Sequence, residues 1–284
     1  MKRILSMVMM IVITITSFGF CSYSNSVVSA DTVSWPSGPG LVAETAVMID
    51  ASTGSILFDK KCHQKMYPAS ITKIMTALLT IENCNLDDTV TFSQSAIDTL
   101  EPEAANIGAV VGEEMSVKDC LYALMLQSAN EVASALAEHV SGSIEEFAKL
   151  MNKRAKQAGA NDAHFANACG LFNKKHYVTA YDMAKIMQAA LQYPVFREII
   201  NSSSYTLPTD NKRKEPLTIS QRHQMVQPWN SFHYDGIIGG KTGFVNESGT
   251  TLVTSAQRDG MTLITVVLNS PGTNSYVDTT ALLD

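Results

Sequence analysis

The sequence predicts an α+β fold with two lobes, in which one antiparallel sheet is built from both ends of the chain and the segment between them is mainly helical. Alternating apolar and polar residues near both ends are typical of strands, whereas residues 70–192 show the three-to-four-residue apolar spacing of helices. Strands far apart in the sequence then have to pair with one another, and the helices between them form a second lobe.

The first 30 residues are typical of a secretory signal peptide. Lys2 and Arg3 precede an apolar run over residues 4–20, and small residues at 28–30 form a cleavage site before Asp31. An apolar run of about 17 residues is at the short end for a membrane span, so a retained anchor is the less favoured interpretation. We therefore predict a signal peptide over residues 1–30 and one mature, exported domain over residues 31–284.

The mature chain is acidic and large enough for an extensive core. Removing residues 1–30 from the 284 leaves 254 and changes the formal net charge from −6 to −8, because two basic residues and no acidic residue are lost. This charge gives no support for nucleic-acid binding. Four cysteines remain, Cys62, Cys84, Cys120 and Cys169, and their spacing matches no metal site. The sequence leaves open whether they form disulfides or free thiols.

The predicted elements follow one another in a simple order. Strands at 43–50 and 55–60 form an N-terminal hairpin, and strands at 250–257 and 261–268 form a second hairpin around the turn 258–260. Residues 201–222 are predicted to form an exposed loop or hairpin. Helices are predicted near residues 70–82, 117–127, 130–141, 144–158 and 179–192.

A serine and a lysine three residues apart form the first candidate catalytic pair. Pro68 precedes a run of helix-forming residues, so a helix is predicted to begin near Ala69 or Ser70, with Ser70 in its first turn. Residues three apart share one helix face, which places the Lys73 amine beside the Ser70 hydroxyl. Taken alone, the pattern would more often be a helix cap followed by a solvated lysine.

The second candidate motif, Ser128-Ala129-Asn130, lies between two apolar helical runs. It predicts a short turn that carries Ser128 and Asn130 into a buried cleft. The alternative is a simple helix break with Ser128 as the cap of the next helix, and both interpretations can hold at once.

The third motif, Lys241-Thr242-Gly243, belongs to a predicted strand over residues 236–245. Glycines at 239, 240 and 243 leave little side chain at that edge, as close approach of a ligand backbone requires. An extended peptide can pair with such an edge by strand addition. A hairpin turn with an exposed lysine is the alternative for this motif alone. The three motifs together, in this order, indicate acyl transfer through a serine ester.

These motifs make the chain similar to the low-molecular-mass penicillin-binding proteins, which are serine-type D-alanyl-D-alanine carboxypeptidases of peptidase family S11. The resemblance covers about residues 42–284 and includes the segments 43–50, 167–171, 176–182 and 235–240. It implies a serine β-lactamase/transpeptidase-like fold, with a five-stranded antiparallel sheet flanked by helices and an all-helical insert.

The resemblance also implies a function in the cell wall. The expected substrate is a peptidoglycan stem peptide ending in D-Ala-D-Ala, with β-lactam antibiotics as covalent inhibitors. The expected location is the cell wall or the outer face of the cytoplasmic membrane, with peripheral association there. No histidine or carboxylate group has metal-ligand spacing in the sequence, so we expect no metal and no cofactor.

Each motif residue then receives a chemical role. Ser70 is the predicted nucleophile, and Lys73 is the base that takes its proton, kept neutral by burial and by positive charge from Lys241. Ser128 is placed to relay a proton to the leaving amine. Asn130 is placed to orient Lys73 and to hold a carbonyl of the substrate.

Substrate binding is assigned to the third motif. Lys241 and Thr242 are suited to a charge-assisted contact with the terminal carboxylate, and Gly243 gives the room for it. By resemblance, the backbone amides of Ser70 and Phe244 form the oxyanion hole.

The chain departs from these relatives in two places. Relatives usually continue into a β-rich domain and an amphipathic membrane-associating helix, whereas this sequence ends at Asp284 within a predicted final helix. Relatives also often use a basic residue near the last strand to bind the substrate carboxylate. Residues 268–274 contain none, so we expect Lys241 and Thr242 to make that contact.

Four alternatives to a serine carboxypeptidase differ in the sequence features that each of them requires. A class A β-lactamase needs a deacylating glutamate in a Glu-x-x-Leu-Asn pattern, and residues 145–152 are out of register with it. A β-lactam sensor or an inactive scaffold is less favoured, because a sensor is expected to carry a signalling transmembrane domain, which the sequence does not show, and because the motif set is intact. A nucleophilic Cys169 would need a histidine such as His164 or His176 beside it. An endopeptidase that cuts D-alanyl cross-links differs only in the leaving group and stays open.

Overall fold

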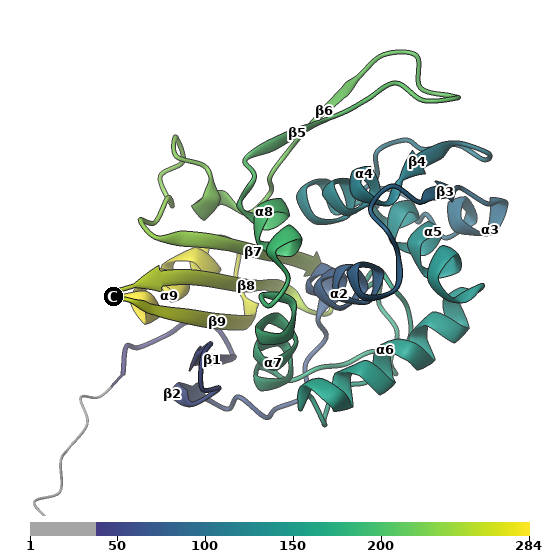
Figure 1. Cartoon of the computed structure of the whole chain (residues 1–284). Helices are drawn as coiled ribbons and strands as arrows, with labels where there is room; N and C mark the ends of the chain where they lie inside the picture. The colour runs from purple at the N-terminus through teal and green to yellow at the C-terminus, as the bar shows by residue number, and fades with distance from the viewer. Residues whose placement is uncertain (1–37) are drawn as a thin grey trace, which may run out of the picture. The chain divides into compact units, whose positions relative to one another are not determined.

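A five-stranded antiparallel sheet forms one lobe of the computed structural model, which describes residues 38–284 (Figure 1). The strand order is β2-β1-β9-β8-β7, so both ends of the described chain contribute and β7 is an edge strand. The α+β class and the five-stranded sheet are therefore confirmed. The strands are β1 (Thr45–Asp50), β2 (Ile56–Lys60), β7 (Ile237–Val245), β8 (Gly249–Arg258) and β9 (Met261–Ser270).

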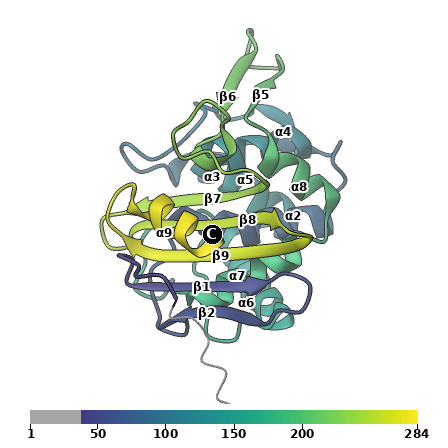
Figure 2. The same cartoon turned by 90° about the vertical axis from the view of Figure 1, so that its left-hand side faces the viewer.

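The centre of the sheet is buried on both faces. Helix α9 (Asn274–Leu283) packs on β8 and β9, while α7 (Ala180–Ala190) packs on β9 and β1 from the opposite face (Figure 2). Strands covered on both faces need continuous apolar runs, and residues 263–268 of β9 are a buried run of Leu, Ile, Thr, Val, Val and Leu. The sheet is therefore a rigid support for its edge strand β7.

The second lobe is helical and surrounds α2 (Lys73–Asn83). Residues 73–80 of α2 are all buried, as expected of a helix that is enclosed on every side. A 3₁₀ turn (Ala69–Thr72) leads into α2 and lies against β7. The other helices are α3 (Gln94–Asp98), α4 (Val117–Tyr122), α5 (Asn130–Ser141), α6 (Ile144–Ala158) and α8 (Pro194–Asn201).

The helix predictions are most accurate where the apolar spacing is regular and the caps are strong. The predicted helices 130–141 and 144–158 coincide with α5 and α6, and both end at a glycine with positive φ, Gly142 and Gly159. The prediction of one helix over 117–127 was only partly correct, because α4 continues into a π-helical turn (Ala123–Gln127). The sequence analysis missed α3, α8 and the two-stranded sheet of β3 (Thr89–Thr91) and β4 (Glu114–Ser116).

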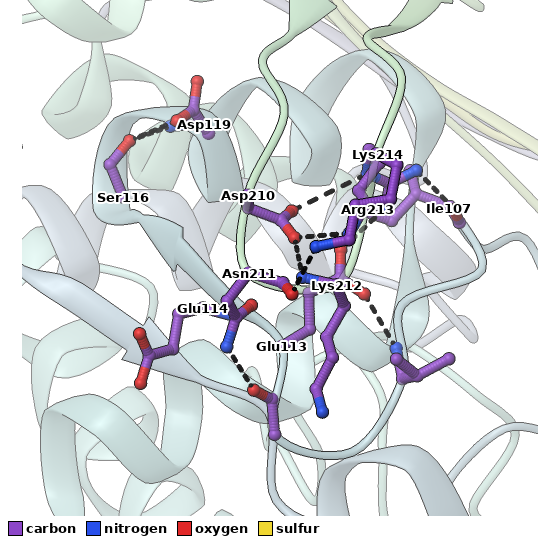
Figure 3. A network of polar contacts seen from close by, with 12 residues as sticks. Ile107, Glu113, Glu114, Ser116, Asp119, Asp210, Asn211, Lys212, Arg213 and Lys214 are labelled. Carbon is purple, nitrogen blue, oxygen red and sulfur yellow. Dashed lines mark hydrogen bonds and ion pairs between the residues drawn. The ribbon is translucent and has the colours of Figure 1, made fainter.

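A long hairpin projects from the sheet lobe and reaches the helical lobe. Its strands are β5 (Ser204–Leu207) and β6 (Leu217–Ser220), within the segment predicted as an exposed loop or hairpin. The turn at its tip contacts the start of β4: Arg213 forms an ion pair with Glu113 at 2.9 Å, and the Asn211 side-chain amide bonds the backbone on both sides of Glu113 (Figure 3). The hairpin therefore ties the two lobes together.

No helix within residues 38–284 has the length and apolar character needed to cross a bilayer. The predicted signal peptide, residues 1–30, lies outside the described residues.

Candidate active site

Ser70 and Lys73 meet as the sequence predicted. The helical turn begins at Ala69, Ser70 is its second residue, and the Lys73 Nζ atom lies 3.0 Å from Ser70 Oγ. Lys73 is completely buried. The first residues of this segment therefore place an amine within hydrogen-bond distance of a candidate nucleophile.

The Lys73 amine has two further partners that fix its direction. Nζ donates to Asn130 Oδ1 at 2.6 Å and to the backbone carbonyl of Cys169 at 2.8 Å. A neutral amine has two N–H donors and one lone pair. With both donors used by Asn130 and Cys169, the lone pair of the neutral form is directed at the Ser70 hydroxyl.

Burial lowers the pKa of Lys73 to about 8. The Cys169 and Glu131 side chains act in the opposite direction, and the positive charge of Arg222 lowers the pKa further. Arg222 is thus a second source of positive charge, besides the Lys241 that the sequence analysis named. A pKa near 8 leaves the ammonium form in the majority at pH 7 and makes the neutral base a substantial minority.

The Ser128-Ala129-Asn130 turn is a strained link between two helical segments. Ser128 ends the π-helical turn with φ +65°, a left-handed conformation that non-glycine residues rarely adopt. Asn130 is the first residue of α5. The proposed capping role of Ser128 was wrong, because Ala129 occupies the cap position and no side chain caps this helix. Strain of this kind is concentrated at functional sites.

Lys241 is bonded to the serine of the second motif. Its Nζ donates to Ser128 Oγ at 3.0 Å and to the Thr242 carbonyl at 2.9 Å, and its side chain is 1% exposed. Burial, with additional repulsion from Lys73 and Arg222, lowers the pKa of Lys241. Each of the two buried lysines is thus hydrogen-bonded to one of the two serines.

The β7 edge faces the Ser70 turn across a gap too small for a side chain. A Cβ atom on Gly243 would lie 2.8 Å from the Ser70 amide nitrogen and 2.4 Å from Thr251 Oγ1. A Cβ on Gly170 would lie 1.9 Å from the Ala69 carbonyl oxygen, and Gly170 has φ +90°. Glycine is thus required on both sides of the nucleophile.

A cavity of about 680 Å³ opens over these residues. Ser70, Ser128, Asn130, Thr242 and Phe244 all line it, and the Phe244 side chain is 64% exposed. Lys73 and Lys241 lie behind this lining. The structure therefore brings together every site residue predicted from the sequence.

Arg222 is a cavity-lining residue that the sequence analysis missed. It follows β6 and its guanidinium group forms no ion pair with any residue in 38–284. Residues 201–222 were predicted only to form an exposed loop or hairpin, and a basic residue for the substrate carboxylate was expected near the last strand. No local pattern in the sequence indicates that Arg222, two residues after β6, lines the same cavity as Ser70, because this depends on the tertiary fold.

The geometry excludes a cysteine nucleophile. Burial raises the pKa of the Cys169 thiol. Its Sγ atom contacts Asn167 Oδ1 at 3.6 Å rather than a histidine, while His176 bonds Thr72 Oγ1 at 3.0 Å. Cys169 contributes its backbone carbonyl to Lys73 instead. All four cysteines of the described residues are free thiols.

Comparison with known proteins agrees with this geometry. The sequence profile of the D-alanyl-D-alanine carboxypeptidase family, Peptidase_S11, matches residues 32–272. The chain belongs to this family. It is 35% identical to the D-alanyl-D-alanine carboxypeptidase DacF of Bacillus subtilis over 232 residues, which cover 80% of this chain and 57% of DacF.

A shorter family member matches over most of its length. The D-alanyl-D-alanine carboxypeptidase of Streptomyces sp. K15 is 32% identical, with 82% of each chain covered. The crystal structure of the Streptomyces K15 DD-transpeptidase superimposes with a TM-score of 0.79, at 29% identity, covering 87% of this chain and 97% of that one. The sequence thus spans 57% of the longer DacF and nearly all of the structurally characterised catalytic fold.

Proposed function

We propose that this protein is a serine D-Ala-D-Ala carboxypeptidase, which removes the terminal D-alanine from peptidoglycan stem peptides through an acyl-enzyme on Ser70. The observation that carries the proposal is the position of Lys73 Nζ, 3.0 Å from Ser70 Oγ and held there by Asn130 and the Cys169 carbonyl. The names of the relatives and their family support the same reaction.

In the acylation step, neutral Lys73 takes the proton of Ser70 as Oγ attacks the carbonyl carbon of the penultimate D-alanine. The negative charge that develops on the carbonyl oxygen is stabilised by the backbone amides of Ser70 and Phe244, at the contact between the 3₁₀ turn and β7. Because these donors are already held in place, their reorganisation does not add to the barrier.

Departure of the terminal D-alanine requires a proton on its amine. Ser128 lines the cavity with Ser70, and Lys241 Nζ lies 3.0 Å from Ser128 Oγ. Ser128 passes its proton to the leaving amine and recovers one from the lysine pair. Lys241 therefore acts mainly through Ser128, since its amine is buried behind the cavity wall.

The terminal carboxylate is bound by Thr242 and Arg222. Both line the cavity with Ser70, and Arg222 provides the cation that residues 268–274 lack. A charge-assisted hydrogen bond to a carboxylate is worth about 1.5–3 kcal/mol. Arg222 thus supplements the contact first expected from Lys241 and Thr242 alone.

The proposed reaction also fixes the expected inhibitors and location. A β-lactam carries an acyl group and a carboxylate in the same relation as the D-Ala-D-Ala terminus, so Ser70 is acylated by it. Peptidoglycan lies outside the cytoplasmic membrane, which requires export of the mature domain to the cell wall or the outer membrane face.

The deciding experiment uses mass spectrometry to measure the release of D-alanine from an acyl-D-Ala-D-Ala peptide and, separately, the splitting of a cross-linked muropeptide into its two stem peptides. We expect release from the peptide and no cleavage of the cross-link, whereas the reverse would establish an endopeptidase. Adding free glycine tests for transfer to an amine, because the Streptomyces K15 structure is called a DD-transpeptidase.

Ser70→Ala is the matched control for that experiment. It should lose both D-alanine release and covalent labelling by penicillin while keeping its fold. Full activity in Ser70→Ala would overturn the proposal.

A further inference from the structure

The two helices that start at the active site also end together, at a cluster of a cysteine, an aspartate and a histidine. Cys84 directly follows α2, Asp88 lies in the turn after it, and His139 lies in the last turn of α5. One donor atom from each of the three lies within 4.8 Å of the other two. The sequence analysis found no metal spacing, because His139 is brought to Cys84 only by the packing of α2 against α5.

The types of donor match one class of ion. Thiolate, imidazole and carboxylate together are ligands for zinc and similar transition metals, while calcium and magnesium prefer oxygen alone. Tetrahedral zinc with bonds of about 2.0–2.3 Å separates its ligand atoms by about 3.3–3.8 Å. Donors within 4.8 Å of one another are close to that separation, and a water would complete four-coordination.

The backbone that carries the three residues is held in place. The Cys84 amide donates to the Thr80 carbonyl at 3.0 Å, and the Asp88 carbonyl accepts from the Val117 amide at 2.9 Å. Asp88 also accepts a bond from the Asn85 amide at 2.8 Å, which orients its carboxylate. The site is therefore arranged before any ion binds, which reduces the entropy lost on binding.

Electrostatics favour a cation at the same point. The α2 and α5 helices both direct their C-terminal ends there, and each helix end carries a partial negative charge. The Asp88 carboxylate adds a full negative charge. Within residues 38–284, no lysine or arginine forms an ion pair with Asp88 that would neutralise it.

We propose that Cys84, Asp88 and His139 form a zinc-type metal site, which joins the ends of α2 and α5 that lie away from the catalytic residues. Lys73 and Asn130 already link the opposite ends of these helices through a 2.6 Å hydrogen bond. On binding, the Cys84 thiol loses its proton to solvent and the thiolate coordinates the ion, with no change in oxidation state. The metal is structural, because it lies at the far ends of both helices from Ser70.

The first test uses cobalt as a spectroscopic substitute for zinc, added to the mature protein after treatment with a chelator. We expect one metal per chain and a near-ultraviolet charge-transfer band from thiolate to cobalt. Zinc should displace cobalt and slow the alkylation of Cys84 by a maleimide, with Cys62, Cys120 and Cys169 as internal references. Absence of the band and no protection of Cys84 would overturn the proposal.

Variants distinguish this site from adventitious binding. Cys84→Ser should abolish the cobalt band, and His139→Ala should weaken zinc binding by about 100-fold or more. His63→Ala is the matched control, since His63 lies 3.9 Å from Asp162 in a histidine–carboxylate pair without a thiol. Equal loss of zinc affinity in His63→Ala and His139→Ala would also overturn the proposal.

A separate readout tests the structural role of the metal. Zinc should raise the thermal unfolding midpoint of the wild-type protein and leave that of Cys84→Ser unchanged. Penicillin labelling of Ser70 in both proteins verifies that the variant is folded. A zinc-dependent rise of equal size in Cys84→Ser would contradict the assignment.

Discussion

The basicity of Lys73 is determined by its burial, its charged neighbours and its hydrogen bonds. Its side chain is buried, its two donors are used by Asn130 and Cys169, and its pKa is lowered to about 8. The reactive form is the neutral amine, which becomes the major form above this pKa. The rate of acylation should therefore rise with pH.

We expect kcat/KM for D-alanine release to increase with pH and to reach half of its maximum near pH 8. Well below pH 8 the increase should be about tenfold per pH unit, because the fraction of neutral Lys73 changes by that factor. The measurement is a kcat/KM profile from pH 6 to pH 9. A profile that falls as the pH rises through 8 would show that the ammonium form is the active one.

Arg222 is expected to act on both binding and basicity. Arg222→Gln should raise KM for a peptide with a terminal carboxylate by about 10- to 100-fold, and a carboxamide-terminated peptide should lose less. Removing this charge should also raise the pKa of Lys73 and move the rate profile to higher pH. Arg222→Lys should restore the pH midpoint more fully than the KM, since lysine keeps the charge but not the fork of donors.

The substitution Gly243→Ala tests whether β7 must lie close to the Ser70 turn for catalysis. In Gly243→Ala the new methyl group would lie 2.8 Å from the Ser70 amide nitrogen, so the turn and the strand must separate. Misplacement by about 1 Å can cost about 100-fold in rate, and we expect at least that loss in penicillin acylation. Gly40→Ala is the control, because nothing lies within 4 Å of its added Cβ. Normal acylation by a folded Gly243→Ala would contradict this account.

At the scale of elements, the sequence predicted most where the determinants are local. The Ser70–Lys73 pair was predictable because three residues on one turn fix its geometry, and α5 and α6 have regular apolar faces with glycine ends. Strands β3 and β4 have three residues each, too few to show an alternating pattern. The contacts of Cys169 and Arg222 with the site depend on the tertiary fold and carry no local signal.

The β5–β6 hairpin is an element whose attachment can be measured. Arg213 pairs with Glu113, and the two side chains are 14% and 2% exposed. Arg213→Met would leave the Glu113 carboxylate buried without its cation, which should lower the free energy of unfolding by about 3 kcal/mol. Urea denaturation provides the measurement.

The control for this prediction is the exposed ion pair of Lys149 and Glu146, whose side chains are 72% and 56% exposed. Lys149→Met should change stability by less than about 0.5 kcal/mol. If Arg213→Met lowered the free energy of unfolding no more than Lys149→Met does, the contact between the β5–β6 hairpin and Glu113 would add nothing measurable to stability.

At the scale of the whole molecule, two buried histidines, one in each lobe, are expected to make the stability of the fold depend on pH. His176 bonds Thr72 in the helical lobe, and His223 bonds Thr254 of the sheet at 2.8 Å. Burial lowers the pKa of each to about 3. Both side chains are therefore neutral in the folded protein across the range in which the unfolded chain takes up protons.

We expect the folded protein to lose stability as the pH falls from about 6.5 toward 3. The unfolded histidines bind protons near pH 6.5 while the folded ones do not, so acid favours unfolding. Between pH 6.5 and pH 5 the loss is about 1.6 kcal/mol for each histidine, measured by urea denaturation at both pH values. His223→Gln should remove about half of this pH dependence, whereas His63→Gln, with a side chain that is 58% exposed, should leave it unchanged. Stability that is constant over this range would show that His176 and His223 take up protons equally in the folded and unfolded protein, and would contradict this account.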